Sequence, residues 1–262
     1  MKDQRAKGSL GLVGALTVCG LLATGAPVAQ AVPALQLDIA GGFYDTTTQT
    51  ILTSSNSFTL YALLDTTNHR VSASDTYYIS VALTPMTATP GNLGSFTVNG
   101  TNVNVTSGMT YGVPPIELSG AADFDPGDLA PHEIYPTYFR EFAFTFNPLN
   151  RAGIYNTATT PGGITANIGG AGLLYAAFTV DRSLLSSPYQ LHFDLYNEVI
   201  HNRTNRQGVV LSTDIDINKF APFSHDAGTT TRGVPEPSAA LLLGIGLVGF
   251  GVWQRIRASQ SA

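Results

Sequence analysis

Histidine and acidic side chains stand together at several places in the chain, and these residue types bind metals or transfer protons. They are found as His132-Glu133, as His225-Asp226, and as His192 and Asp194, with His201 close by. Because His192 and Asp194 are two residues apart, they share one face of a strand. No H-E-x-x-H spacing and no G-x-S-x-G segment accompanies them. We therefore interpret His132-Glu133 and His225-Asp226 as pairs that fix loops by local hydrogen bonds.

A turn-rich acidic segment carries three carboxylates within six residues, those of Asp123, Asp125 and Asp128. Calcium takes roughly six to eight oxygen ligands, so an exported loop of this kind is a candidate calcium site. The spacing is not that of an EF-hand, and a solvated acidic turn is the alternative. Residues 214–218 alternate polar with apolar side chains, which fits an exposed edge strand or a second calcium patch.

Glycoside hydrolysis needs two carboxylates that face each other across a cleft. The sequence offers candidates but does not pair them: Glu117, Glu133, Glu141 and Glu198. Since no known catalytic motif accompanies them, we expect that the protein is not an enzyme. A calcium-dependent carbohydrate-active enzyme is the alternative.

Tyrosines offer a binding chemistry instead, because an aromatic face with a polar tip suits stacking on sugars or contact with proteins. Half-buried structural positions are the alternative for most of them. The candidates are Tyr111, Tyr135, Tyr138, Tyr155, Tyr189 and Tyr196.

Strand patterns between residues 32 and 228 must position these side chains. Segments 57–64 and 77–83 are rich in β-branched and aromatic residues, and apolar residues alternate over 142–146 and 191–195. Segment 173–180 is typical of a more fully buried strand. Turn formers separate these segments, as at Asn99-Gly100, Pro90-Gly91, Pro161-Gly162-Gly163 and Gly169-Gly170. The pattern predicts an all-β domain, a β-sandwich of jelly-roll-like type.

Charge and cysteine content exclude two further classes of protein. Residues 32–233 carry eight Lys and Arg against sixteen Asp and Glu, within a whole-chain net charge of −5. Nucleic-acid binding needs clustered basic residues, so we expect no nucleic-acid partner. The single cysteine, Cys19, excludes an intrachain disulfide and a cysteine-based zinc site.

The N-terminus is typical of a secretory signal peptide, predicted as a helix over residues 1–31. Lys2, Arg5 and Lys7 precede an apolar run, and Ala29-Gln30-Ala31 forms an A-x-A cleavage site with cleavage after Ala31. The exported domain then covers residues 32–228.

The C-terminus predicts a membrane anchor. A linker over residues 229–238 contains Pro235-Glu236-Pro237, and residues 239–253 follow without a charge before Arg255 and Arg257. Fifteen residues in a helix span roughly 22 Å, which is less than the roughly 30 Å thickness of the hydrocarbon core. The segment 239–257 just crosses a bilayer when its arginine side chains extend to the headgroups. Its basic end places the C-terminus in the cytoplasm.

This order of features resembles a PEP-CTERM sorting signal, carried by Pro235, Glu236, Pro237, the apolar helix, Arg255 and Arg257. The resemblance implies recognition and processing by an exosortase in the membrane of a Gram-negative bacterium that makes exopolysaccharide. It predicts a protein held by its C-terminal helix and then displayed at the cell surface or in the extracellular matrix.

The interior resembles the choice-of-anchor N proteins, in phrases such as residues 35–42, 75–85, 111–115, 132–139 and 220–226. That resemblance implies surface display and no established activity. We expect a non-enzymatic envelope protein associated with extracellular polysaccharide, with an adhesion or assembly module as a further alternative.

Overall fold

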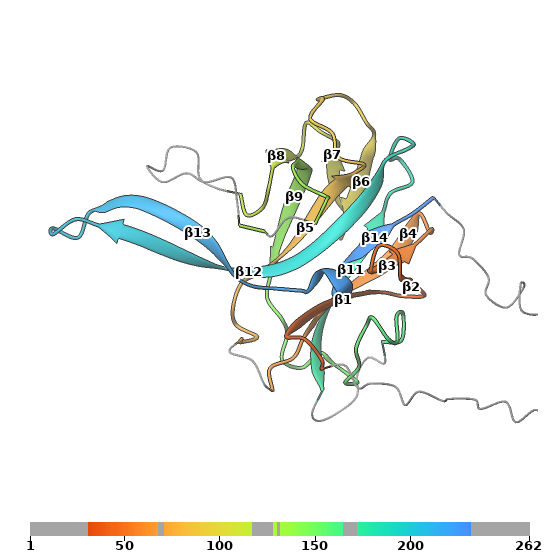
Figure 1. Ribbon diagram of the computed structural model, residues 1–262, viewed down its shortest axis with the longest axis horizontal. Helices are drawn as coiled ribbons and strands as arrows, with labels where there is room; N and C mark the ends of the chain where they lie inside the picture. Colours follow the sequence, from red (N-terminus) through yellow and green to blue (C-terminus); the bar gives the residue numbers. More distant parts are fainter. Residues whose placement is uncertain (1–30, 68–70, 117–127, 130–131, 165–171, 232–262) are drawn as a thin grey trace, which may run out of the picture. The chain divides into compact units, whose positions relative to one another are not determined.

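The computed structural model describes residues 31–67, 71–116, 128–129, 132–164 and 172–231. The chain divides into two units, Met1–Gln30 and Ala31–Ala262, and the described residues belong to the second. They form fourteen strands in two sheets and one 3-10 helix, η1 (Phe223–His225) (Figure 1). The predicted signal helix and C-terminal membrane helix lie outside the described residues, apart from Ala31. No helix within the described ranges is long and apolar enough to span a bilayer.

The first sheet follows the strand order β1-β4-β11-β6-β7, with β10 paired to β11. All its pairings are antiparallel. Its strands are β1 (Leu35–Ile39), β4 (Ser57–Leu64), β6 (Ser95–Val98), β7 (Thr101–Asn104), β10 (Arg151–Ala152) and β11 (Leu173–Asp181).

The second sheet follows the order β2-β3-β14-β12-β5-β9-β8, with β13 paired to β12. Only the β3–β14 pairing is parallel among those described. Its strands are β2 (Phe43–Asp45), β3 (Thr50–Thr53), β5 (Tyr77–Thr84), β8 (Thr110–Gly112), β9 (Thr137–Phe144), β12 (Gln190–Thr204), β13 (Val210–Phe220) and β14 (Ala227–Thr229).

The core lies between the two sheets. Alternating apolar residues of β4 and β12 belong to one buried cluster, and the rings of Phe58 and Phe193 meet edge to face with centroids 6.0 Å apart. Burying these faces is the main stabilising contribution, since each large apolar side chain removed from water is worth about 1.5–3 kcal/mol. The predicted all-β sandwich is confirmed in this part of the chain.

A smaller apolar cluster covers the outer face of the second sheet. Leu129 and Tyr135, from the segment that precedes β9, pack with Ala82, Phe139 and Tyr196. Both faces of β12 are consequently buried over its first half. Polar residues on the outward face of β12 are thereby enclosed, and this positions the site described below.

Two strand predictions need correction. The segment 173–180 forms β11, but Ala177 and Thr179 are exposed, so the strand is buried on one face over its second half. The alternating segment 142–146 belongs to β9 only as far as Phe144. Phe146 lies beyond the strand, yet it is buried and its ring packs edge to face on Tyr77 at 4.8 Å.

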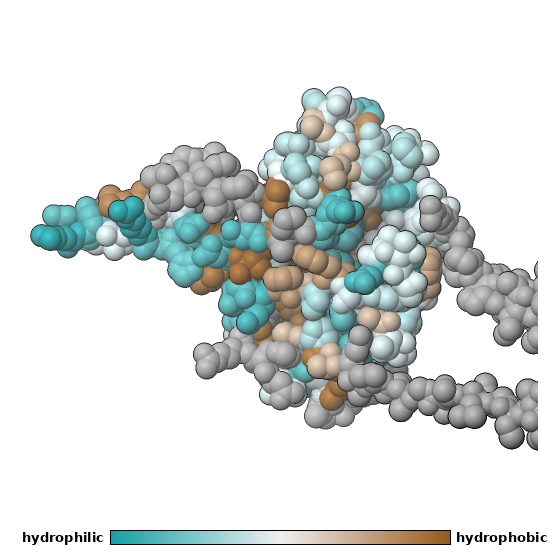
Figure 2. Space-filling view, viewed as in Figure 1, coloured by the Kyte–Doolittle hydropathy of each residue, from teal (hydrophilic) through white to brown (hydrophobic). Residues whose placement is uncertain are grey.

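The second half of β12 and β13 form a hairpin that extends beyond the rest of the sheet, which we call the arm (Figure 1). Residues 190–197 of β12 pair with β5, and residues 196–204 pair with β13, so beyond residue 197 β12 pairs with β13 and no longer with β5. The predicted edge strand at 214–218 is therefore confirmed. Figure 2 shows a mostly hydrophilic arm with some hydrophobic side chains, and Ile200, Val210 and Leu211 are exposed there.

The predicted turn at Asn99-Gly100 joins β6 to β7. Asn99 and Gly100 both have positive φ, 48° and 77°, as a two-residue type I′ hairpin turn requires. We expect Gly100→Ala to lower the free energy of unfolding by about 1 kcal/mol, because a Cβ strains this backbone although no atom lies within 4 Å of it. Urea denaturation of the purified chain measures the effect.

Gly91→Ala is the matched control, because Gly91 is outside the positive-φ set and its added Cβ meets only Leu93 at 3.8 Å. We expect that variant to be as stable as the parent or slightly more stable. Equal losses in the two variants would contradict the turn's role.

Candidate functional site

Four polar side chains from three separate segments meet on the outward face of the second sheet. His192 and Asp194 project from β12, His132 comes from the segment before β9, and Asp226 lies between η1 and β14. One ligand atom from each residue lies within 4.8 Å of all the others. We call these four residues the His-Asp cluster.

The closest approaches join both imidazoles to a single carboxylate oxygen. His132 Nε2 lies 3.0 Å from Asp194 Oδ1, and His192 Nε2 lies 3.3 Å from the same atom. The two Nε2 atoms are 3.2 Å apart. Asp226 Oδ2 approaches His192 Nε2 at 3.8 Å. All four side chains are less than a tenth exposed, so water screens these charges weakly.

Electrostatics separates the two carboxylates of the cluster. Burial opposes the charge of Asp194, but His192 and His132 outweigh it and hold the pKa of Asp194 well below its usual range. Burial, together with the nearby charge of Asp194, raises the pKa of Asp226 well above its usual range. Asp226 Oδ2 has no hydrogen-bond partner among the described residues.

Further residues fix the orientation of the cluster. Tyr135 donates its hydroxyl hydrogen to Asp194 Oδ2 at 2.6 Å, and Ser80 Oγ lies 3.0 Å from the same tyrosine oxygen. The ring of His132 stacks on Phe223 with centroids 4.3 Å apart and planes 15° from parallel. Two imidazole nitrogens and two carboxylate oxygens held in this way are donors that a divalent transition metal accepts.

The structure tests the interpretation of His132-Glu133 and His225-Asp226 as pairs that fix loops by local hydrogen bonds. For His225 the predicted local hydrogen bonding is confirmed by its Nδ1, which lies 2.8 Å from Ser224 Oγ. Its Nε2 makes a long-range contact instead, 3.0 Å from Asn156 Oδ1. Burial lowers the pKa of His225 to about 4. For His132 and Asp226 the interpretation was wrong, because both join a cluster with β12. Only the spacing of His192 and Asp194 pointed to it in the sequence.

The other predicted acidic residues do not join this cluster within the described part of the chain. Asp123 and Asp125 lie outside the described residues, and Asp128 is exposed, so the calcium site stays a prediction. His201, on the exposed arm, pairs with Asp216 at 3.1 Å.

The glutamates are similarly dispersed. Glu117 lies outside the described residues, and Glu133 is exposed. Glu141 accepts hydrogen bonds from the hydroxyl of Tyr196 and from the backbone N–H of Ile116, while burial raises its pKa. Its contacts are those of a structural hydrogen-bond acceptor.

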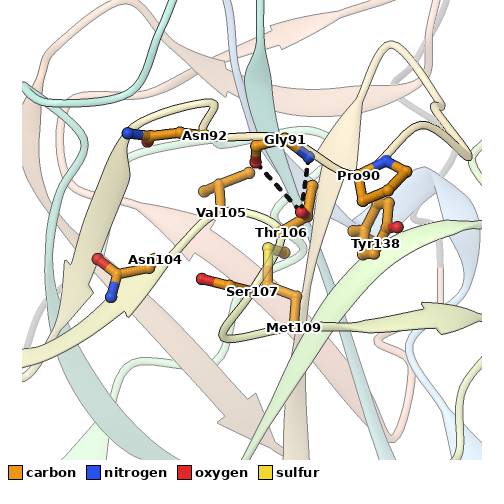
Figure 3. A pocket seen from close by; sticks show the side chains of 9 residues that line it. All are labelled: Pro90, Gly91, Asn92, Asn104, Val105, Thr106, Ser107, Met109 and Tyr138. Carbon is orange, nitrogen blue, oxygen red and sulfur yellow. Dashed lines mark hydrogen bonds between the residues drawn. The ribbon is translucent and has the colours of Figure 1, made fainter.

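A separate open pocket of about 750 Å³ lies among the loop before β6, the end of β7 and the residues that follow it (Figure 3). In the close-up, Thr106 holds Gly91 through two hydrogen bonds, with Gly91 N–H donating to Thr106 Oγ1 at 3.1 Å and Thr106 donating to Gly91 O at 3.2 Å. The described lining carries amides, hydroxyls and apolar groups: Pro90, Gly91, Asn92, Asn104, Val105, Thr106, Ser107, Met109 and Tyr138.

One tyrosine prediction bears on this pocket. Tyr138, from β9, lines it, and the ring of Tyr111 meets Tyr138 edge to face at 5.4 Å. Tyr111 is 45% exposed, whereas Tyr135 and Tyr196 are buried. Of the six predicted tyrosines, Tyr138 and Tyr111 therefore lie at or near a pocket, and Tyr135 and Tyr196 are structural. The remaining two are structural as well, since Tyr155 donates its hydroxyl hydrogen to Asp38 and Tyr189 packs against the core.

A second, smaller hollow of about 380 Å³ lies beside the first half of β5 and the middle of β12. Asp75 and Glu198 line it together with Tyr78, whose pKa is raised to about 12 by burial and by Glu198. Of the candidate glutamates for the carbohydrate-active enzyme alternative, Glu198 lines this hollow, and that alternative stays a prediction.

Comparison with known families identifies the C-terminal segment. Residues 233–256 match the PEP-CTERM protein-sorting motif. The match contains Pro235, Glu236, Pro237 and Arg255, and it ends one residue before Arg257. No curated protein and no solved structure matches the chain. The motif indicates an exported, cell-envelope-associated protein whose processing partner is an exosortase.

Proposed function

We propose that the chain is a non-enzymatic envelope protein, displayed after exosortase processing and associated with extracellular polysaccharide. Export and sorting follow from the motif at residues 233–256. The observation that carries the polysaccharide part is the neutral pocket beside Tyr138. We further propose that the sandwich is jelly-roll-like and that the interior belongs with the choice-of-anchor N proteins.

The chemistry of the pocket supports a neutral sugar as its ligand. Amides such as those of Asn92 and Asn104 donate and accept hydrogen bonds, as sugar hydroxyls require. Tyr138 supplies an aromatic surface for the apolar face of a sugar ring. An open pocket on the surface can admit a long chain, whereas an enclosed cavity cannot.

The same lining favours binding without catalysis. Its described residues contribute no carboxylate, imidazole or amine, which are the usual general acids and bases. Binding there would accordingly attach the protein to the polysaccharide and leave the polymer intact.

We expect Tyr138→Ala and Asn104→Ala each to weaken binding to exopolysaccharide from the producing cells about 10-fold, equivalent to about 1.4 kcal/mol. Loss of the aromatic surface in one variant and of the amide in the other is the physical reason. Biolayer interferometry of the purified chain on immobilised polysaccharide measures the affinity.

Matched control variants distinguish this site from the rest of the surface. Tyr61 lies on β4 of the first sheet, in edge-to-face contact with Tyr175, and Asn202 lies on the exposed arm. Tyr61→Ala and Asn202→Ala are expected to bind like the parent. If they weaken binding as strongly as the pocket variants, or if the parent does not bind, the polysaccharide proposal fails.

A further inference from the structure

The distances among three ligand atoms of the His-Asp cluster are close to those between the ligands of a tetrahedral metal. Ligand atoms about 2.0–2.1 Å from Zn²⁺ stand about 3.3–3.4 Å apart at the tetrahedral angle. His132 Nε2, His192 Nε2 and Asp194 Oδ1 are separated by 3.0, 3.2 and 3.3 Å. Asp226 Oδ2 lies 3.8 Å from His192 Nε2, and the ligand atoms of all four residues lie within 4.8 Å of one another, so a small inward shift of Asp226 brings it to the distance of a fourth ligand.

The charge of the cluster also favours a dication. Asp194 and Asp226 are buried to 2% and 1% exposure, and no lysine or arginine forms an ion pair with either among the described residues. Buried carboxylates are retained when they are paired or when they coordinate a metal. A single Zn²⁺ balances two carboxylates and leaves both imidazoles neutral.

Asp226 provides an independent observation. Its Oδ2 atom is buried in the cluster and has no hydrogen-bond partner among the described residues. Buried polar atoms are rarely left without a partner, because each such loss costs about 1–3 kcal/mol and more for a charged group. A coordinated ion satisfies this atom directly.

The surroundings support ligation by the remaining atoms. Tyr135 donates a hydrogen bond to Asp194 Oδ2, so Asp194 Oδ1 faces the two imidazoles. Outer-shell hydrogen-bond partners orient metal ligands in this way. Phe223 stacks on His132 and fixes the plane of its ring.

We propose that His132, His192, Asp194 and Asp226 bind one divalent transition-metal ion, with Zn²⁺ as the best match, in a buried four-coordinate site. Imidazole nitrogens suit zinc, whereas calcium and magnesium take oxygen ligands. Four protein ligands close the coordination shell, so the ion is structural. It ties the segment before β9 to β12 and to the residue before β14, and the ligands from different segments are more than 30 residues apart in sequence.

Cobalt replacement tests the geometry and the ligands together. The purified full chain is stripped with EDTA, dialysed and titrated with Co²⁺, while Zn²⁺ content is measured by mass spectrometry after addition of Zn²⁺. We expect one equivalent of each metal and the intense visible bands of four-coordinate Co²⁺. Excess Ca²⁺ is expected to leave these bands unchanged.

His132→Ala and Asp226→Asn test the ligand assignment. We expect each to weaken Zn²⁺ binding by more than the roughly 10–100-fold that loss of an outer-shell partner costs. Asp226→Asn keeps the size of the side chain, and circular dichroism confirms that each variant is folded. The matched control is His201→Ala, which removes an exposed histidine from the arm and is expected to bind metal like the parent.

Three results would overturn the site. These are absence of stoichiometric metal in the parent, the weak bands of six-coordinate Co²⁺, or unchanged binding in both His132→Ala and Asp226→Asn. Each of them leaves the polysaccharide proposal untouched, because that proposal rests on the separate pocket beside Tyr138.

Discussion

Deletion of residues 233–262 is expected to move the protein from the cell envelope to the culture medium. The deletion removes the matched sorting motif and the predicted apolar helix, while residues 31–231 keep both sheets and the core between them. Insertion of a membrane helix is effectively irreversible, so we expect the ratio of medium to envelope protein to rise at least roughly 10-fold. Immunoblots of the two fractions measure this ratio.

A point substitution separates recognition from anchoring. We expect Glu236→Gln to block exosortase processing and to leave the unprocessed 27.6 kDa chain, or its form without the signal peptide, in the membrane. The double variant Arg255→Lys and Arg257→Lys keeps both positive charges and is expected to remain membrane-held. Retention of the deletion variant at the cell surface would contradict anchoring by this segment.

Local patterns in the sequence predicted the strands because they depend on neighbouring residues. The alternation around Leu191, Phe193 and Leu195 places three side chains in the core, and Asn99-Gly100 has the positive φ angles that its turn needs. The finer jelly-roll-like connection stays a prediction. Burial of a whole strand was harder to predict, as Ala177 shows, because it depends on whether another layer covers the outer face.

Only two of the four residues of the His-Asp cluster could be predicted from the sequence to lie together. Strand alternation places His192 and Asp194 on one face, but His132 and Asp226 reach them through tertiary contacts. The segment around Leu129 and Tyr135 covers that face of the sheet. No local sequence pattern predicts that a segment folds over a sheet in this way. The pocket near Tyr138 is similar, since it combines segments from β7, β9 and the loop before β6.

Hydrogen bonds to Asp38, on the outer face of the first sheet, are the basis of a second prediction with a large expected effect, on stability. Asp38 on β1 is fully buried and accepts three hydrogen bonds, from the Gly162 N–H at 2.7 Å, the Tyr155 hydroxyl at 2.7 Å and the Ile39 N–H at 2.8 Å. Neighbouring Gln36 accepts a further bond from the Thr157 N–H at 3.0 Å. These contacts hold residues 155–162 over the outer face of the first sheet.

We expect Asp38→Ala to lower the free energy of unfolding by about 3 kcal/mol or more, because it leaves three donors without their acceptor. Asp38→Asn keeps the size and one acceptor oxygen, so its loss is expected to be about 1–2 kcal/mol. Asp45→Ala is the control, since that half-exposed carboxylate accepts one bond, from the Thr47 N–H, and a loss below about 1 kcal/mol is expected. Urea denaturation measures all three variants.

The pH dependence of the same variants tests the cause. Burial raises the pKa of Asp38 more than its three donors lower it, so the folded chain holds this proton to higher pH than the unfolded chain does. The contribution of Asp38 is therefore fully present below about pH 4 and is lost as the pH rises through the raised pKa. We expect the stability difference between the parent and Asp38→Asn to shrink from pH 4 upward. A difference that grows over this range would show that the donors outweigh burial and that Asp38 is stabilised as a carboxylate.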